Sequence, residues 1–179
     1  LVLYLMILVL MIFLILLLTL INMEILLKEK PRQPLDYSDA DVELLARTLY
    51  GEARDQGEEG MTAVGNVVLN RLNKKSWYGD SIEEIIKIPY QFSVFNPETK
   101  PDQFEQDDNY KATISATVDD PDYIAAREIA LGLLEGRIKD NTDGATHYYN
   151  PDEANPTWID SPKMKSLKKI KKHSFYLEG

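Results

Sequence analysis

The pattern of apolar and polar residues divides the chain into one unbroken apolar segment and a longer mixed segment. Residues 1–23 carry no charged side chain. A helix of that length covers roughly 35 Å, against about 30 Å for the hydrocarbon core of a bilayer. A signal peptide would have a basic start and an apolar region of only about 7–15 residues. We therefore expect residues 1–23 to be a transmembrane anchor, whereas a start at Met23 would leave a soluble protein.

A short linker is expected to follow, over residues 24–37, because Lys30-Pro-Arg-Gln-Pro34 contains two prolines that resist helix formation. The folded domain is then expected over residues 38–179. Its first helix should begin near Asp39, with Asp36 or Ser38 as the N-cap.

Apolar residues at spacings of three and four continue this first helix along one face, at Val42, Leu45 and Leu49. The next position on that face is Glu52. Gly51 and Gly57 are expected to mark the end of the helix.

Similar patterns predict further elements, and together they indicate an α+β fold that is mainly helical, with a small antiparallel sheet near the C-terminus. The helices are expected at Glu58–Leu72, Ile82–Ile88, Tyr110–Thr117 and Pro121–Leu134, and the strands at Ala145–Asn150 and His173–Leu177.

Composition excludes several classes of function. The chain has no cysteine, so thiol chemistry and Cys-ligated zinc are ruled out. His147 and His173 are the two histidines and lack the spacing of a zinc protease, so we expect no metal and no cofactor. A net charge of −9 and a pI near 4.8 argue against nucleic acid as a partner.

The segment Lys163–Lys172 stands apart in charge, because it holds six lysines and no acidic residue. It could bind an anionic wall polymer or a membrane surface, or it could be a solvated loop.

Glu52 is the first candidate for chemistry. A carboxylate on the apolar face of a helix loses hydration, which raises its pKa and favours the protonated form that a general acid needs. The alternative is that the helix frays at Gly51 and Glu52 turns to solvent.

A second candidate is an aromatic and polar cluster, of a kind that binds sugars by ring stacking and hydrogen bonds. It comprises His147, Tyr148, Tyr149, Asn150, Trp158, His173, Phe175 and Tyr176. Neighbouring strand residues face opposite ways. We expect His147 and Tyr149 to share the cleft face opposite Glu52, with Tyr148 on the packing side.

Several strings resemble the SleB/CwlJ cell-wall hydrolases, which include spore cortex-lytic enzymes and phage endolysins. They are Leu44-Leu-Ala-Arg-Thr-Leu-Tyr-Gly-Glu-Ala-Arg54, Glu59-Gly-Met-x-Ala-Val-Gly-Asn-Val-Val-Leu-Asn-Arg71, Gln91-Phe-Ser93, Phe95-Asn-Pro97, Gly144-Ala-Thr-His-Tyr-Tyr-Asn-Pro151, Ala154-Asn-Pro156, Trp158 and His173-Ser-Phe-Tyr176. One departure is Ile170-Lys-Lys-His173, where the family has Ile-Gly-x-His.

The resemblance implies a lysozyme-like helical core and cleavage of peptidoglycan glycan strands, with Glu52 as the catalytic glutamate. It also implies that the Gln-Phe-Ser and Thr-His-Tyr segments line the cleft. The expected substrate-binding residues are Gln91, Phe92, Ser93, Thr146, His147, Tyr149, Asn150, Trp158 and His173.

The favoured reaction is that of a lytic transglycosylase on the MurNAc–GlcNAc bond. A hydrolytic muramidase would need a second carboxylate, for which Asp55 and Asp143 are candidates. A non-catalytic peptidoglycan-binding module and an amidase also remain open, and serine chemistry would need a Ser93–His147 pair. We expect a monomer, anchored in the membrane with its catalytic domain facing the wall, or a soluble endolysin if translation starts at Met23.

Overall fold

The computed structural model describes the backbone of residues 2–28 and 32–179, and the side chains of residues 6–23 and 32–179. The chain forms two compact units, Leu1–Arg32 and Gln33–Gly179. The first consists of helix α1, Val2–Lys28. Its stretch Met6–Met23 has a mean hydropathy of 3.0 and is long and apolar enough to cross a membrane, and none of it is buried.

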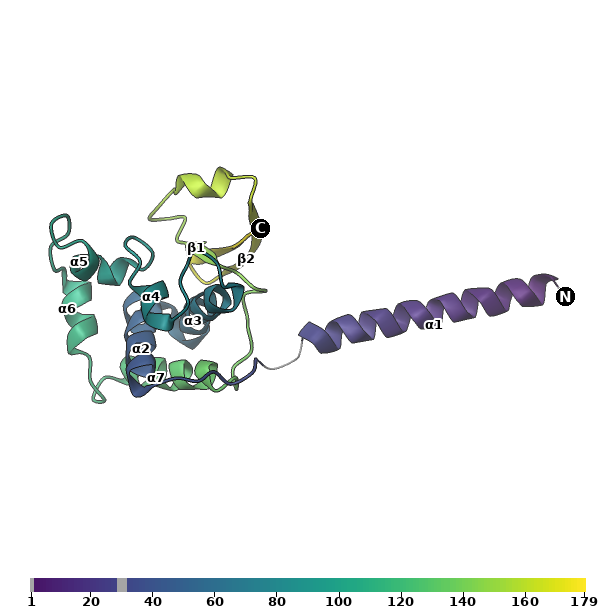
Figure 1. Ribbon diagram of the computed structural model, residues 1–179, viewed down its shortest axis with the longest axis horizontal. Helices are drawn as coiled ribbons and strands as arrows, with labels where there is room; N and C mark the ends of the chain where they lie inside the picture. The colour runs from purple at the N-terminus through teal and green to yellow at the C-terminus, as the bar shows by residue number, and fades with distance from the viewer. Residues whose placement is uncertain (1, 29–31) are drawn as a thin grey trace. The chain divides into compact units, whose positions relative to one another are not determined.

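The second unit is a helical domain with one small sheet (Figure 1). Its α-helices are α2 (Asp39–Ala53), α3 (Gly57–Lys74), α4 (Ile82–Ile86), α5 (Asn96–Thr99), α6 (Asp108–Ser115) and α7 (Pro121–Leu134). Its 3-10 helices are η1 (Arg54–Gln56), η2 (Ser93–Phe95) and η3 (Thr157–Asp160). Its strands are β1 (His147–Tyr149), β2 (Met164–Ile170) and β3 (His173–Glu178).

The predicted start of α2 is confirmed, with Ser38 as the N-cap. Its hydroxyl accepts from the Asp41 amide while the Asp41 carboxylate accepts from the Ser38 amide, which completes a capping box. We expected Gly51 and Gly57 to mark the end of this helix. The helix instead runs past Gly51 to Ala53 and continues into η1. The break falls at Gly57, whose φ of +67° lies in the left-handed region.

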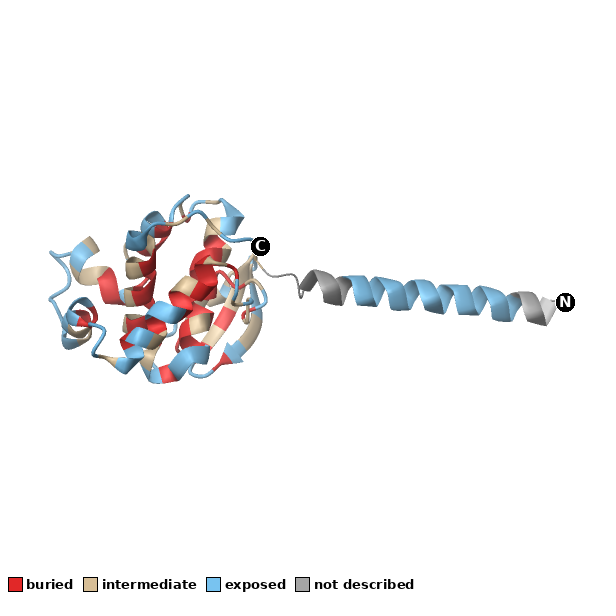
Figure 2. Ribbon diagram, turned by 90° about the horizontal axis from the view of Figure 1, so that it is seen from below, coloured by how far each residue is buried: buried red, intermediate tan, exposed pale blue. Residues whose placement is uncertain are grey.

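Apolar faces of α2, α3 and α7 make the main core, in which Leu45, Leu49, Val64 and Leu133 are fully buried. Figure 2 shows that buried residues gather inside the domain, with exposed residues on its outer surface. Gly65 allows α3 and α7 to approach closely, because a Cβ there would lie 2.4 Å from Leu133 Cδ1.

A second, smaller core joins the opposite face of α3 to the sheet, through Ala63 and Val67 of the helix and Phe175 of β3. The strands pair antiparallel in the order β1-β3-β2. The α+β class and the small C-terminal sheet are therefore as predicted.

Strand β2 was missed, because its lysines gave Lys163–Lys172 the composition of a solvated segment. Side chains of β2 alternate between the two faces of the sheet, so a strand can carry many lysines. Ile170 turns inward while Lys165 and Lys169 turn outward. The turn to β3 places Lys171 at φ 52° in the position of the family glycine, so the hairpin still forms, with Ile170 opposite His173.

The expected linker, residues 24–37, differs from the structure at both ends. It begins within α1, and its residues 29–31 lie outside the described part of the chain. At its other end Leu35 and Tyr37 pack on the main core, and the Leu35 amide bonds the Leu134 carbonyl at 2.9 Å.

We predict that a chain starting at Met23 folds and stays in the soluble fraction, whereas the full chain sediments with membranes. The reason is that Met6–Met23 is uniformly apolar and contributes no buried residue. Circular dichroism and membrane fractionation of the two chains test this. An unfolded truncated chain would show that α1 is needed for the fold.

Candidate active site

The carboxylate of Glu52 is the centre of the site. Glu52 lies near the C-terminal end of α2 and is partly buried. Its Oε1 accepts hydrogen bonds from the Val94 amide at 2.9 Å and the Ser93 hydroxyl at 3.1 Å, and its Oε2 accepts one from the Tyr148 hydroxyl at 2.8 Å. Donors from η2 and β1 therefore fix the carboxyl group of α2.

Burial raises the pKa of Glu52 above its ordinary value, although the hydrogen bonds from Val94, Tyr148 and Ser93 act in the opposite direction. The expectation that this carboxyl is desolvated and held inward is borne out, and it does not turn to solvent. Burial and the adjacent Glu52 charge raise the pKa of Tyr148 well above its ordinary value, so its hydroxyl keeps its proton.

Gly51 is a close-packing residue rather than a helix terminator. A Cβ at Gly51 would lie 2.5 Å from Val94 Cγ2 and 2.9 Å from Thr113 Oγ1. Its missing side chain lets α2 approach η2 closely enough for the Val94 amide to reach Glu52.

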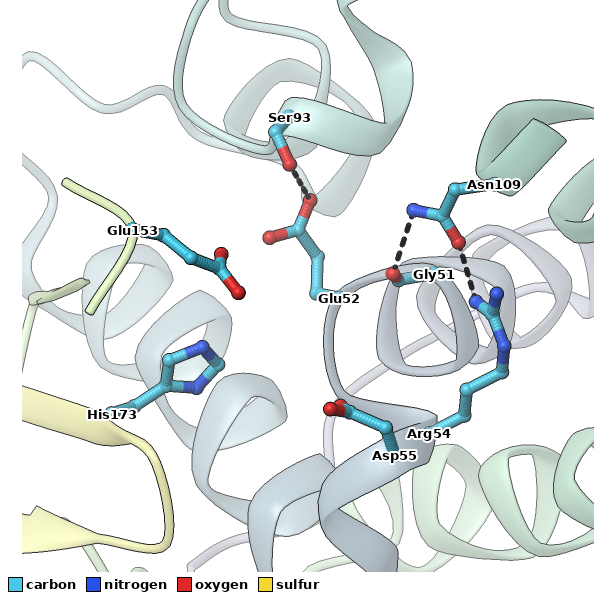
Figure 3. A pocket seen from close by; sticks show the side chains of 8 residues that line it. All are labelled: Gly51, Glu52, Arg54, Asp55, Ser93, Asn109, Glu153 and His173. Carbon is cyan, nitrogen blue, oxygen red and sulfur yellow. Dashed lines mark hydrogen bonds between the residues drawn. The ribbon is translucent and has the colours of Figure 1, made fainter. Parts of the chain in front are cut away.

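Glu52 opens into a hollow of about 280 Å³, here called the Glu52 pocket. It is lined by Gly51, Glu52, Arg54, Asp55, Ser93, Asn109, Glu153 and His173. Figure 3 shows Glu153 reaching across this hollow towards Glu52, with His173 and Asp55 along its edge. The carboxylates of Asp55 and Glu153 give the pocket an acidic lining.

His173 is a neutral wall of this pocket. Burial lowers its pKa to about 4, and Gln56 Nε2 lies 3.2 Å from its Nε2 and 3.3 Å from its Nδ1. Gln56 also accepts from the Lys172 amide at 3.2 Å, so it ties the β2–β3 turn to η1, which follows α2.

A second hollow, of about 310 Å³, lies on the other side of Tyr148 and is here called the Arg71 pocket. It is lined by Arg71, Trp77, Tyr90, Gln91, His147, Tyr148, Trp158, Met164 and Glu178. Tyr148 lines the Arg71 pocket, and its hydroxyl bonds Glu52 in the Glu52 pocket. Gln91 lines the Arg71 pocket, whereas Ser93 lines the Glu52 pocket.

Tyr148 lies on the packing side, as expected, stacked on Phe175, but the expectation that the face of His147 and Tyr149 meets Glu52 is wrong. His147 and Tyr149 do share a face, on which both contact Trp158. It is Tyr148 that turns to Glu52, packing between His173 and Phe92 with its hydroxyl on the carboxylate. Strand alternation was applied correctly, but it cannot tell which of the two faces meets α2.

The predicted substrate-binding residues fall into two groups. Gln91, Ser93, His147, Trp158 and His173 line one of the two pockets. The others do not line either hollow. Phe92 and Thr146 are each 1% exposed and belong to the interior, so direct contact with substrate is contradicted for them.

Asn150 and Tyr149 also act locally. Asn150 Oδ1 accepts from the Asp152 amide and so holds the turn that carries Glu153. Tyr149 is half-buried against Trp158 and Tyr176.

Ser93, His147 and Asp143 do not come together at one site. Ser93 bonds Glu52, whereas His147 bonds Thr146 Oγ1 at 3.1 Å in the other pocket, so these two do not form a pair. Asp143 is ion-paired to Lys168 at 2.8 Å and does not line the Glu52 pocket. Within residues 6–23 and 32–179, no group of three or more metal-ligating side chains is found.

Sequence reasoning missed several pocket residues, among them Arg54, Asn109 and Glu153 around Glu52, and Trp77 and Glu178 around Arg71. Arg54 and Asn109 join each other, and Asn109 Nδ2 also bonds the Gly51 carbonyl at 3.1 Å. These contacts join distant segments and leave no local pattern.

We predict that Gly51→Ala lowers the free energy of unfolding by about 1–3 kcal/mol, because the new methyl group overpacks against Val94. Urea denaturation of Gly51→Ala, Val94→Ala and the double variant measures this. The double variant should lose less than the sum of the single losses, since Val94→Ala removes the clashing methyl. Strictly additive losses would contradict the close contact.

Comparison with known proteins gives consistent matches. The family model described as Cell Wall Hydrolase matches residues 55–176, a range that begins just after Glu52. The spore cortex-lytic enzymes of Halalkalibacterium halodurans and Bacillus subtilis are 35% and 32% identical over 79% of this chain, which covers 36% and 39% of their lengths. The chain thus spans less than half of these relatives.

Two solved structures resemble the chain over 80% of its length. The catalytic domain of the germination-specific lytic transglycosylase SleB from Bacillus anthracis has a TM-score of 0.60 at 28% identity, with 98% of it covered. The catalytic domain of Bacillus cereus SleB has a TM-score of 0.59 at 29% identity, with 94% covered. The chain belongs to the SleB/CwlJ-type cell wall hydrolase family.

Proposed function

We propose that this chain cleaves the MurNAc–GlcNAc bond of peptidoglycan as a lytic transglycosylase, with Glu52 as general acid and then general base. The observation that carries the proposal is a desolvated carboxyl with a raised pKa, fixed by three donors at the wall of a pocket. Its similarity to spore cortex-lytic enzymes and to a catalytic domain described as a lytic transglycosylase supports the same reaction.

The two oxygens of Glu52 have different tasks. Oε1 already accepts from the Val94 amide and the Ser93 hydroxyl, so the transferable proton belongs on Oε2. The Tyr148 hydroxyl beside Oε2 can accept from the protonated acid and donate to the carboxylate. It therefore supports both states of Glu52 without moving.

In the first step Glu52 gives its proton to the glycosidic oxygen while the bond from C1 to that oxygen breaks. The bonding electrons leave with the oxygen, and C1 acquires oxocarbenium character. In the second step the muramic C6 hydroxyl oxygen bonds to C1, and its proton returns to Glu52. The product is a 1,6-anhydro sugar, and no water is consumed.

Hydrolysis is a second candidate, because Asp55 and Glu153 bring two further carboxylates to the Glu52 pocket. Either could orient a water molecule at C1 in a muramidase. Asp55 is ion-paired with Lys172 at 2.5 Å, and this leaves Glu153 as the better placed of the two.

We also propose that α1 anchors the chain in a membrane with the catalytic domain facing the wall. The apolar stretch Met6–Met23 supports this placement. This anchoring does not require that the lysines of β2 contact a membrane or the wall.

We predict that Glu52→Gln lowers lytic turnover by about 10²–10⁴-fold or more, because it removes the proton used in both steps. It should not lower the melting temperature, because Gln can keep the same partners and removes a desolvated carboxyl. Lysis of purified sacculi and thermal unfolding are measured together. A folded Glu52→Gln protein with more than a tenth of wild-type turnover would contradict the mechanism.

Mass spectrometry of digested sacculi separates the candidates. Anhydromuramic ends support the transglycosylase, whereas new reducing ends that disappear in Glu153→Gln support hydrolysis. Unchanged sacculi would support a non-catalytic binding module. Cut stem peptides would support an amidase.

We predict that Tyr148→Phe lowers kcat by about tenfold or more and shifts the alkaline limb of the pH profile upward. The lost donor stabilises ionised Glu52, so its removal raises the Glu52 pKa further. Tyr149→Phe is the matched control, since it lies on the opposite face and keeps its ring. Equal effects of the two substitutions would contradict the assignment of Tyr148.

A further inference from the structure

Arg71, on α3, forms part of the Arg71 pocket and is buried to an unusual degree for a cation. It is 3% exposed. Its Nε donates to the Thr146 carbonyl at 2.7 Å, but its Nη1 is buried with no hydrogen-bond partner among the described residues. A buried donor without an acceptor costs about 1–3 kcal/mol.

The guanidinium group of Arg71 is held in a fixed position. It lies 5.0 Å from the centroid of the Tyr78 ring and 5.4 Å from that of the Phe92 ring. With Nε tied to the Thr146 carbonyl, just before β1, the group cannot turn to find another partner. Nη1 is covered by the residues around it, so an acceptor supplied by a ligand in the pocket would satisfy it once a small shift of the pocket wall admits that acceptor.

The charge of the pocket selects the kind of acceptor. Burial and the neighbouring Arg71 charge lower the pKa of His147 to about 4, so this wall is neutral at neutral pH. Glu178 also lines the pocket; burial opposes its ionisation, but donors from Tyr78 and Trp77 outweigh burial and lower its pKa. The ionised Glu178 carboxylate would repel an anionic ligand. A neutral acyl oxygen carries no net charge and would avoid that repulsion.

The other walls are aromatic and amide in character. Trp77, Tyr90 and Trp158 offer apolar surface for a sugar face and a methyl group, and Gln91 offers an amide. Tyr148 joins this pocket to Glu52, so a sugar bound here lies next to the unit at which Glu52 would act.

We propose that the Arg71 pocket binds the acetamido group of an N-acetylated aminosugar, with Arg71 Nη1 donating to its carbonyl oxygen. The inference rests on the proposed glycan substrate, and it identifies the subsite that distinguishes an N-acetylated sugar from a de-N-acetylated one. Arg71 acts as a binding residue and takes no part in proton transfer.

The test measures binding to the full chain carrying Glu52→Gln, so that no turnover interferes. Calorimetry compares N-acetylglucosamine tetramer with its de-N-acetylated form, at a pH at which the amines are neutral. The acetylated sugar should bind roughly tenfold tighter or better. Adding Arg71→Lys should remove this preference by weakening the acetylated sugar alone, since Lys lacks the planar fork.

Arg137→Lys, at an exposed arginine paired with Glu135, is the matched control and should change neither affinity. Equal affinities of Glu52→Gln for the two tetramers would overturn the proposal, and this comparison holds even if Arg71→Lys fails to fold. Equal weakening of both sugars by Arg71→Lys would also overturn it, because Arg71 would then be structural.

Glycan strands de-N-acetylated only on GlcNAc show which sugar occupies the Arg71 pocket. If these strands lose the binding that depends on Arg71, the pocket binds the acetamido group of GlcNAc. If they keep it, the pocket binds that of MurNAc. The outcome is separable from that of the proposed function. Sacculi that resist the wild-type enzyme would reject the catalytic proposal, while the acetyl preference of Glu52→Gln could still be present. Lysis without that preference would reject the subsite alone.

Discussion

The hydrogen bonds to the Glu52 carboxylate are the constraint on which the site depends. A carboxyl group removed from water keeps a defined orientation only if its oxygens find donors. Here they come from Ser93, the Val94 amide and Tyr148, which lie more than forty residues away along the chain. Packing of α2 against η2 and β1 therefore serves to bring these donors to one carboxylate.

Two features of the helices make that meeting possible. Gly51 removes the side chain that would separate α2 from η2. Helix α3 packs on α2 and α7 with one face and on the sheet with the other, and Arg71 at its far end bonds the carbonyl of Thr146, just before β1. Helices α2 and α3 thus position both Glu52 and the proposed sugar-binding pocket at Arg71.

The sequence predicted the elements whose cause is local: the cap at Ser38, the existence of α3 and the bounds of α7 follow from neighbouring residues. It placed Glu52 inward for the same reason. It missed β2, where lysines hid the alternation. It also expected His147 and Tyr149 opposite Glu52, where the structure has Tyr148, because the face that meets α2 is set by tertiary packing. Glu153 carried no local signal, and Arg71 stood in a string that resembles the family without any sign that it lines a pocket.

The central claim is that desolvation outweighs three hydrogen bonds and keeps Glu52 protonated to a higher pH than an ordinary glutamate. Carbon-13 NMR titration of the side-chain carboxyl, assigned by its loss in Glu52→Gln, measures this directly. The structure predicts a Glu52 pKa above the ordinary value of 4.5. A titration at or below that value would contradict the assignment of Glu52 as the general acid.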